Sequence, residues 1–332
     1  MHILYGMDSR LQDITEKIQN RDLLRAIAKI AHIFAPLCMH FIDWIIAQKP
    51  HNQVRFMLRD GELFFETAKT MASVSPRYKI CADWTADYLT NNMLDHIPDE
   101  YLKPYLDKNW NQSMTMIDVG CEGGLVNALR RFFPDNDYFP LFLGSDNPDI
   151  PGFLNESAGI TEYMDNFKKS IAEKKVATYK SSAAAFAILL EHFPKKEFSP
   201  HTLCHRRADG SLYIMNDFNQ YVLCPDESKP YLYLQNPGLP QINNADGDLH
   251  IRPENKFHQA AHKIFFDSLR AAVTEYGRSA RPPSVGDAVA RICEIAPGLK
   301  EIGKTLIPHN EDGISAFESV HKKEIAQILK VR

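Results

Sequence analysis

The 332-residue chain lacks several features that mark specialised classes of protein. Its six cysteines are scattered, and no two form a Cys-x-x-Cys pair. This usage excludes a disulfide framework and favours reduced thiols in a cytoplasmic compartment. The net charge of −4 gives no electrostatic case for a nucleic-acid partner. We therefore expect a folded cytoplasmic protein that does not bind DNA or RNA.

The sequence also has no long uninterrupted apolar run. Its most apolar stretch, residues 26–47, carries Lys29, His32, His40 and Asp43. This composition is typical of a buried helix and not of a bilayer span. The N-terminus has no basic segment followed by an apolar one, as a secretion signal would have. We expect no membrane span.

Apolar segments alternate with helical ones between residues 54 and 143. The expected strands are Val54–Leu58, Lys79–Trp84, Met114–Val119 and Tyr138–Leu143. The segments between them, including residues 86–108, have helical spacing. The alternation predicts an α/β fold with a Rossmann-like, mostly parallel sheet and helices on both faces.

The remaining segments divide the chain around this core. Residues 1–50 are expected to form a helical segment packed on the core, broken or restarted at Pro36. The core itself spans residues 51–277, with an insertion at about 151–250. A small β meander within the insertion is expected to contain Leu212–Met215, Tyr221–Cys224 and Tyr231–Leu234, after a polar loop around residues 201–207. An amphipathic helix at 257–276 closes the core, and residues 284–332 form a helical tail.

Four polar side chains follow or end the expected strands. Right-handed crossovers bring the carboxyl ends of parallel strands to one edge, which we call the carboxyl edge, and ligands of open α/β sheets bind there. Asp60, Thr85, Asp118 and Asp146 are therefore expected to share this edge. Arg59 adds a planar guanidinium suited to clamping a phosphate. A buried ion pair or a helix cap would also explain the Arg59–Asp60 pair.

The turn after the first expected strand resembles part of the haloacid-dehalogenase phosphoryl-transfer scheme. Leu58-Arg-Asp-Gly61 places Asp60 at the second Asp of the hhhhDxDG motif, an acid–base group. Thr85 resembles the hydroxyl of strand two, and Asp146 resembles a strand-four carboxylate that holds Mg²⁺, with Asp60 as the other ligand. Two departures are clear: Leu58 occupies the nucleophile position and cannot attack phosphorus, and no lysine is obvious before the fourth strand.

A glycine-rich segment follows the third expected strand. Ile117-Asp-Val-Gly-Cys-Glu-Gly123 resembles the first motif of class I methyltransferases. Gly120 and Gly123 would let the backbone approach a ligand, and Asp146 lies at about the distance of a ribose-binding acid. That motif belongs on a first strand, whereas two strands precede it here. An S-adenosylmethionine-dependent methyltransferase and a purely structural turn stay open as alternatives.

Together, these segments resemble a domain of bacterial proteins described as predicted haloacid-dehalogenase-like hydrolases, often joined to glycosyltransferases of surface-polysaccharide clusters. The resemblance covers about residues 30–276. It depends on an apolar-Trp helix end, the pattern F-L-x-R-D-G, the pattern D-h-G-x-x-G and a strand ending in Leu-Gly. In this sequence these are Phe41–Trp44, Phe56–Gly61, Asp118–Gly123 and Phe142–Gly144.

The resemblance implies a hydrolase or phosphotransferase-type enzyme in bacterial polysaccharide metabolism, acting on a phosphorylated or nucleotide-activated sugar with Mg²⁺. It implies that Asp60 is the principal acid–base or metal-binding group, assisted by Arg59, Asp118 and Asp146. Without a glycosyltransferase domain, the chain is expected to work alone, as a cluster enzyme or a secreted effector. Leu58 keeps a further alternative open: a catalytically degenerate module that binds a glycan, a nucleotide or a protein partner.

Overall fold

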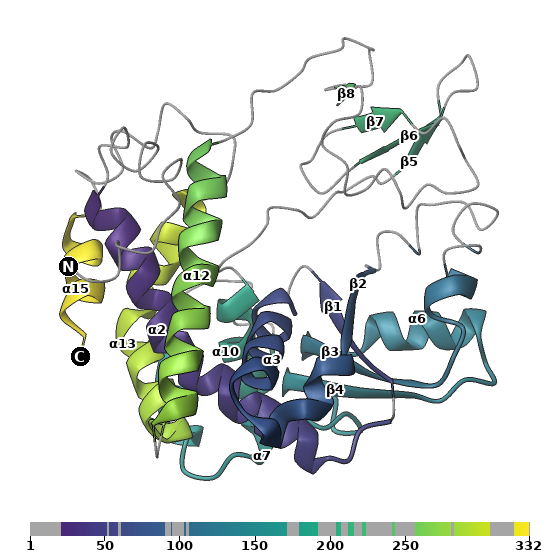
Figure 1. Ribbon diagram of the computed structural model, residues 1–332, viewed down its shortest axis with the longest axis horizontal. Coiled ribbons are helices and arrows are strands. Elements are labelled where there is room, and N and C mark those ends of the chain that lie inside the picture. The colour runs from purple at the N-terminus through teal and green to yellow at the C-terminus, as the bar shows by residue number, and fades with distance from the viewer. Residues whose placement is uncertain are drawn as a thin grey trace.

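A parallel sheet of four strands forms the centre of the fold (Figure 1). Its strands are β1 (Val54–Leu58), β2 (Thr85–Tyr88), β3 (Met114–Cys121) and β4 (Tyr138–Ser145). Helix α3 (Glu62–Val74) follows β1, and helix α6 (Gly124–Phe132) connects β3 to β4. The predicted α/β fold with a parallel sheet is therefore confirmed.

The computed structural model describes most of the chain between residues 21 and 331. The described residues are 21–51, 53–58, 61–89, 94, 103, 106–170, 179–191, 204–206, 212–215, 221–223, 241–242, 256–279, 282–305 and 322–331.

The strands lie in the order β2-β1-β3-β4. From β1 the chain moves outward to β2 on one side and then to β3 and β4 on the other, so the direction of winding reverses between β1 and β3. In the classic dinucleotide-binding order the third strand lies beyond the second. The order found here, with β3 beside β1, is the other common doubly wound arrangement.

The two sheet faces pack against different helices. Phe56 and Ile117 belong to the core that includes α3, which we call the helical face. Met57 and Met116 point to the opposite side and pack with α6, on what we call the α6 face. Right-handed crossovers that leave in opposite directions along a sheet place their helices on opposite faces. Helices on both faces were predicted, and this is confirmed.

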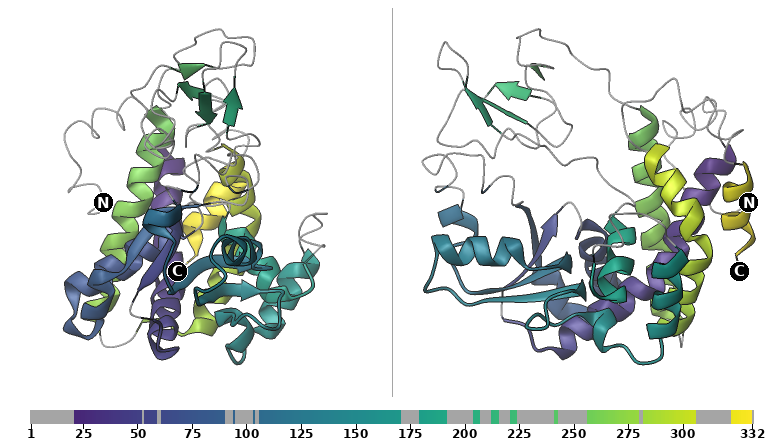
Figure 2. Two further views of the ribbon diagram at one scale, coloured as in Figure 1. Left: turned by 90° about the vertical axis from the view of Figure 1, so that its right-hand side faces the viewer. Right: turned by 180° about the vertical axis from the view of Figure 1, so that it is seen from behind.

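Helices from both halves of the chain pack together around α2, on the side of the fold that carries α3 (Figures 1 and 2). They are α2 (Arg21–Ala47), α12 (Lys256–Arg278), α13 (Val285–Thr305) and α15 (Lys322–Lys330). Helix α2 contacts α3 and each of the other three. Phe34 meets Phe265 of α12 edge-on at 6.2 Å between ring centroids. The helical N-terminal segment and tail thus form one layer with the long helix of the core.

Helix α2 runs without a break through Pro36, so the predicted interruption is wrong. Proline removes one backbone N–H from the helix ladder, but Pro36 and the residues on both sides of it are buried, and this packing maintains the helix. Among the described residues α2 is the one helix long and apolar enough to cross a bilayer, with a mean hydropathy of 1.6. Because 67% of that apolar window is buried inside the protein, it is no clear membrane span.

The segment before β2 differs from the prediction. Residues Pro76–Asp83 form a 3-10 helix, η2, where a strand was expected at 79–84. Tyr78 and Cys81 are buried three residues apart, while Ile80 between them is 53% exposed. This spacing of three is the period of a 3-10 helix. Strand β2 then occupies 85–88, the start of the segment that was predicted to be helical.

Shorter elements complete the described chain. Three helices follow β4: α7 (Phe153–Glu156), α8 (Thr161–Ser170) and α10 (Ser182–Glu191). An antiparallel sheet then contains, in order, β5 (Cys204–Arg206), β6 (Leu212–Met215), β7 (Tyr221–Leu223) and β8 (Gln241–Ile242). The meander is confirmed, although residues 204–206 were predicted as a polar loop. The expected strand 231–234 lies outside the described residues.

Candidate functional site

The reversal of strand order between β1 and β3 marks the point where ligands of open α/β sheets bind, outside the carboxyl ends of the strands. Two of the predicted site segments flank this point, because Arg59-Asp60 follows β1 and Asp118-Val-Gly120 lies in β3. Arg59 and Asp60 themselves lie outside the described residues. The structure describes the strand before them and the glycine after them.

The chain turns sharply after β1. The N–H of Gly61 donates to the carbonyl oxygen of Met57 at 2.8 Å. A Cβ atom on residue 61 would lie 2.5 Å from that same oxygen, so only glycine allows this close approach. The N–H groups of Phe64 and Phe65 then donate to the carbonyl oxygen of Gly61, which begins α3. Backbone hydrogen bonds of Gly61 therefore hold the start of α3 close to the end of β1.

Asp118 lies within β3, opposite Phe142 of β4. It is partly buried, and its side chain lies on the α6 face because it alternates with Ile117 and Val119, which face the other way. Its Oδ1 accepts a hydrogen bond from the N–H of Val119 at 2.8 Å. An ionisable side chain is thus placed on a sheet strand close to the carboxyl edge.

Asp146 follows β4 and binds the start of α10. Its two carboxylate oxygens accept hydrogen bonds from the backbone N–H groups of Lys180 and Ser181, at 2.8 and 2.7 Å. The Oγ of Ser181 in turn accepts from the N–H of Ala184 at 3.0 Å and donates to the carbonyl oxygen of Ser145 at 2.9 Å. These contacts make Asp146 a structural cap that connects β4 to α10.

The register separates Asp118 from Asp146. Asp118 is opposite Phe142, four residues before Asp146, which corresponds to about 13 Å along a strand. Asp118 lies within β3 and Asp146 lies just after the neighbouring strand β4, so the two carboxylates are at different heights. Among the described residues, no three His, Cys, Asp or Glu side chains gather as a metal site would require. The described carboxylates therefore do not form a Mg²⁺ site by themselves.

Thr85 is at the opposite end of the sheet from the position predicted. It is the first residue of β2 and pairs with Arg55, near the start of β1. Its Oγ1 donates to the carbonyl oxygen of Val54 at 3.3 Å and lies 3.4 Å from Nε of Arg55. The prediction that Thr85 ends a strand at the carboxyl edge is wrong, because the preceding segment is a 3-10 helix and the strand begins at residue 85.

The glycines of the turn after β3 have packing reasons of their own. Gly120 and Gly123 have φ values of 133° and 80°, which favour glycine. A Cβ on Gly120 would collide with the carbonyl oxygen of Gly144, and one on Gly123 would collide with the side chain of Ile150. The side chain of Asn147 also donates to the carbonyl oxygen of Glu122 at 3.4 Å. The loop after β4 therefore packs on the turn that was predicted to bind a cofactor.

Free thiols described in the structure are poor candidates for a nucleophile. Cys38 and Cys81 are buried, and Cys293 is partly buried. Burial raises the pKa of Cys38 far above its ordinary value, and it raises the pKa of Cys81 and of Cys293 to about 12. These three groups are protonated at neutral pH, whereas the thiolate is the reactive form.

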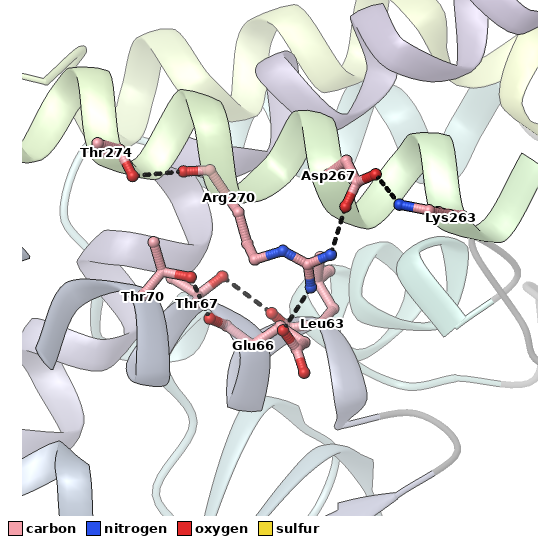
Figure 3. Close-up of polar contacts among 8 residues, drawn as sticks. All are labelled: Leu63, Glu66, Thr67, Thr70, Lys263, Asp267, Arg270 and Thr274. Carbon is pink, nitrogen blue, oxygen red and sulfur yellow. Dashed lines mark hydrogen bonds and ion pairs between the residues drawn. The ribbon is translucent and has the colours of Figure 1, made fainter. Parts of the chain in front are cut away.

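A network of charges that the sequence did not predict connects α12 to α3 (Figure 3). Nη1 of Arg270 donates to Glu66 at 2.8 Å, and Nη2 donates to Asp267 at 2.6 Å. The other oxygen of Asp267 accepts from Nζ of Lys263 at 2.6 Å. The signal in the sequence is the spacing of residues 263, 267 and 270, which places them on one side of a helix. The partner on α3 gives no such signal, because it lies 204 residues away.

The hydrogen bonds of this network together outweigh the effect of burial on the pKa values of Asp267 and Arg270. Burial alone would raise the pKa of Asp267, but the hydrogen bonds from Lys263 and Arg270 lower it below its ordinary value. Burial would likewise lower the pKa of Arg270, but bonds to Asp267 and Glu66 raise it. Asp267 and Arg270 are therefore both held in their charged forms at neutral pH.

Comparison with protein-family models, curated proteins and solved structures finds no match. The case for a function therefore depends on the strand order, the turn after β1 and the charges near it.

A shallow hollow of about 800 Å³ lies away from this edge. It is lined by residues of α2, the last turn of α12 and the start of α13, among them His40, Tyr276 and Arg291. Nε2 of His40 is 2.8 Å from the carbonyl oxygen of Pro283 in its wall. The hollow is at the far end of α12 from Lys263. It therefore does not belong to the site at the reversal of strand order between β1 and β3.

Proposed function

We propose that the protein is a haloacid-dehalogenase-like hydrolase or phosphotransferase-type enzyme that acts on a phosphorylated or nucleotide-activated sugar in bacterial polysaccharide metabolism. The observation that carries the proposal is the reversal of strand order between β1 and β3. It supports a site at which the Arg59-Asp60 segment and Asp118 belong to neighbouring strands. Sites of this kind bind phosphorylated ligands in many doubly wound sheets.

In this proposal Asp60 is the acid–base group and Arg59 binds the phosphate. Leu58 cannot form a phospho-enzyme, so a water molecule is the nucleophile for hydrolysis. Asp60 accepts the proton of this water as the oxygen attacks phosphorus, the bond between phosphorus and the sugar oxygen breaks, and Asp60 returns the proton to that oxygen, so that the sugar leaves as an alcohol. Arg59 stabilises the charge on the phosphoryl oxygens by a bidentate contact.

Mg²⁺ enters the proposal only as an ion for which Asp60 would be a ligand. The described residues do not complete a site for it, because no three His, Cys, Asp or Glu side chains gather among them. No step of the reaction above is assigned to the metal.

The test is release of inorganic phosphate from a panel of sugar phosphates and nucleotide sugars, assayed with and without Mg²⁺. We expect turnover by the natural protein and a loss of at least about a hundredfold in kcat for Asp60→Asn. Asp83→Asn is the matched control, because Asp83 is an exposed carboxylate at the end of η2. Its kcat should equal that of the natural protein, and both variants should unfold at the natural temperature.

Two results would reject the enzyme. One is an absence of phosphate release across the whole panel, with no binding of vanadate. The other is an Asp60→Asn variant that is as active as the natural protein. Either result would favour a degenerate module that binds its ligand without turnover.

The methyltransferase alternative has less support. A cofactor loop needs open space beside its glycines, whereas Gly123 packs against Ile150 and Gly120 approaches Gly144. Calorimetric titration with S-adenosylmethionine decides between the two enzyme classes. Tight binding that is lost in Asp146→Ala would favour the methyltransferase.

A further inference from the structure

The hollow where α2, α12 and α13 meet combines apolar rings with two opposite charges. Its volume of about 800 Å³ lies within the range of small-molecule binding sites. The rings are those of Tyr276, Pro282 and Pro283, and the charges are those of Asp287 and Arg291. Both charges come from the first two turns of α13. A ligand that matches this lining has an apolar body and charged groups close together at one end.

One wall of the hollow is fixed without a ligand. Nε2 of His40, on α2, donates to the carbonyl oxygen of Pro283 at 2.8 Å, because a carbonyl oxygen can only accept. This bond ties the segment before α13 to α2. The rings of Pro282 and Pro283 also restrict the backbone of this segment, since each fixes φ at about −65°. A preformed wall lowers the entropic cost of binding.

The carboxylate of Asp287 is held at the start of α13. Its Oδ2 accepts hydrogen bonds from Oγ of Ser284 at 2.7 Å and from the backbone N–H of Ser284 at 3.3 Å. Oγ of Ser284 in turn accepts from the N–H of Asp287 at 3.1 Å, which makes a capping box. The bonds from Ser284 lower the pKa of Asp287, so the carboxylate is charged at neutral pH. Within the described part of the chain, no hydrogen bond occupies its Oδ1.

Arg291 stays apart from this carboxylate, although it lies four residues further along the helix. Acidic and basic side chains at this spacing are neighbours on a helix surface and often pair. Here the capping box holds Asp287 toward Ser284, and Arg291 acts on Asp287 only through its charge. The guanidinium has no hydrogen-bond partner among the residues that the structure describes. Its planar N–H donors are therefore available for a bidentate contact with a ligand.

The two charges together favour a zwitterion. A simple anion such as phosphate would be attracted by Arg291 but repelled by Asp287, and for a simple cation the reverse would hold. An α-amino acid carries an ammonium and a carboxylate on the same carbon atom, so it offers an opposite charge to each side chain. The termini of a peptide each offer only one of these charges. Charge complementarity thus favours a free amino acid over a peptide, a phosphate or an amine.

We propose that the hollow binds a free α-amino acid with a large apolar or aromatic side chain. The ammonium binds the carboxylate of Asp287, and the carboxylate binds the guanidinium of Arg291. The side chain packs on the ring of Tyr276 and on the two prolines of the wall. The hollow lies away from the carboxyl edge of the sheet, so this site does not depend on the hydrolase proposed above. Binding stabilises the junction of α2, α12 and α13.

The test is calorimetric titration of the full chain with L-phenylalanine, which has both charged groups and an aromatic side chain. We expect a Kd of about 1 mM or below, as befits a ligand of this size. Phenylpropionate lacks the ammonium, and phenylethylamine lacks the carboxylate. Each should bind at least about tenfold more weakly than L-phenylalanine, because each leaves one charge of the hollow unpaired. These comparisons use the natural protein and do not depend on the folding of a variant.

Variants assign the two contacts. Arg291→Met should raise the Kd for L-phenylalanine about tenfold and should not weaken phenylethylamine, which has no carboxylate to lose. Arg291→Lys should lie between Arg291→Met and the natural protein, because an ammonium keeps the charge but not the bidentate geometry. Asp287→Asn keeps an acceptor for Ser284 and should weaken L-phenylalanine about tenfold without weakening phenylpropionate. Arg131→Met is the matched control, because Arg131 is an exposed arginine on α6, and its Kd should equal the natural one.

Four results would overturn the proposal. The first is the absence of binding heat, and of any rise in unfolding temperature, with every apolar or aromatic α-amino acid at about 10 mM. The second is an Arg291→Met variant that binds L-phenylalanine as the natural protein does. The third is equal binding of N-acetylphenylalanine amide, which would indicate a peptide segment as the ligand. The fourth is tighter binding of inorganic phosphate than of L-phenylalanine, which would indicate an anion site.

Discussion

The two faces of the parallel sheet are built very differently. On the helical face, α2, α3, α12 and α13 form a deep core in which aromatic rings such as Phe34, Phe41 and Phe64 are fully buried. Among the described residues of the α6 face, helix α6 and the segment around Trp110 cover a smaller cluster. The comparison indicates that the helical face supplies most of the stability, while the α6 face has room for polar groups such as Asp118.

Arg55 shows how the α6 face accommodates a charge. Its side chain is only 12% exposed, and its guanidinium lies over the ring of Trp110 at 4.9 Å from the centroid. It also lies 3.7 Å from the carboxylate of Asp87 and donates to the carbonyl oxygen of Asn109. These contacts connect β1 to β2 and to the segment before β3. The charge of Arg55 is thus matched by partners on this face, whereas the buried Nε1 of Trp110 has no hydrogen-bond partner.

The largest effect should come from truncating a ring on the helical face. Phe64 is fully buried and contacts Phe41 edge-on at 4.7 Å between centroids. Phe64→Ala should reduce the free energy of unfolding by about 3–5 kcal/mol. Leu129→Ala, its counterpart on the α6 face, should cost about 2–3 kcal/mol. Urea unfolding of both variants measures this, and an equal or reversed order would break the comparison between the faces.

A methyl group at residue 120 should have the next largest effect. Gly120→Ala combines a φ of 133° with a collision against the carbonyl oxygen of Gly144 and should cost about 2–4 kcal/mol. Gly159→Ala separates the two causes, because Gly159 has a φ of 78° and no atom within 4 Å of an added Cβ. Its cost should be about 1 kcal/mol. Equal costs, measured by thermal unfolding, would show that the β3–β4 contact is not tight.

Asp146 tests whether a carboxylate at the sheet edge is structural or functional. Asp146→Ala removes the acceptor for two backbone N–H groups and should cost about 1 kcal/mol of stability, as loss of a helix cap does. The exposed Asp149 provides the control, and Asp149→Ala should leave stability within about 0.5 kcal/mol. If Asp146→Ala unfolds like the natural protein but loses Mg²⁺-dependent activity, the carboxylate is a metal ligand and not a cap.

The smallest effect is expected on the network between α12 and α3. Asp267→Asn should cost less than about 1 kcal/mol, because all its partners are partly exposed. Since the pKa of Asp267 is lowered in the folded protein, its contribution is present above the ordinary carboxyl pKa of about 4 and is lost as pH falls through the lowered value. The difference between the natural protein and the variant should therefore vanish in acid. A constant difference across pH would show that charge is not involved.

Local patterns in the sequence were sufficient for three of the four parallel strands. Strands β1, β3 and β4 carry buried apolar residues on both faces, as buried parallel strands do. The prediction of a strand failed before β2. Tyr78 and Cys81 are buried three residues apart, as in a 3-10 helix, but the apolar residues near them made the segment resemble a strand. Because of this error, Thr85 was predicted to end a strand, whereas it begins one. Right-handed crossovers allow either strand order, so the place of β3 beside β1 could not be predicted from spacing.

The polar contacts of the site were harder to predict than the strands. An aspartate after a strand predicts an edge position, and Asp146 has one. Its use as a cap depends on α10, which begins more than thirty residues later in the chain. Arg270 and Glu66 are likewise distant in sequence, and each alone resembles an ordinary solvent-exposed charge. Contacts of this kind are determined by tertiary packing, which local periodicity does not report.

The long apolar helix α2 leaves the ribosome before α12, α13 and α15, which bury it, have been synthesised. During synthesis its hydrophobic surface must wait for these helices, the first of which begins at Lys256, before it is covered. Nascent chains with such exposed surfaces are prone to aggregate and are substrates for chaperones. Production of this protein in a foreign host should accordingly depend more on chaperone supply than on the speed with which the central sheet assembles.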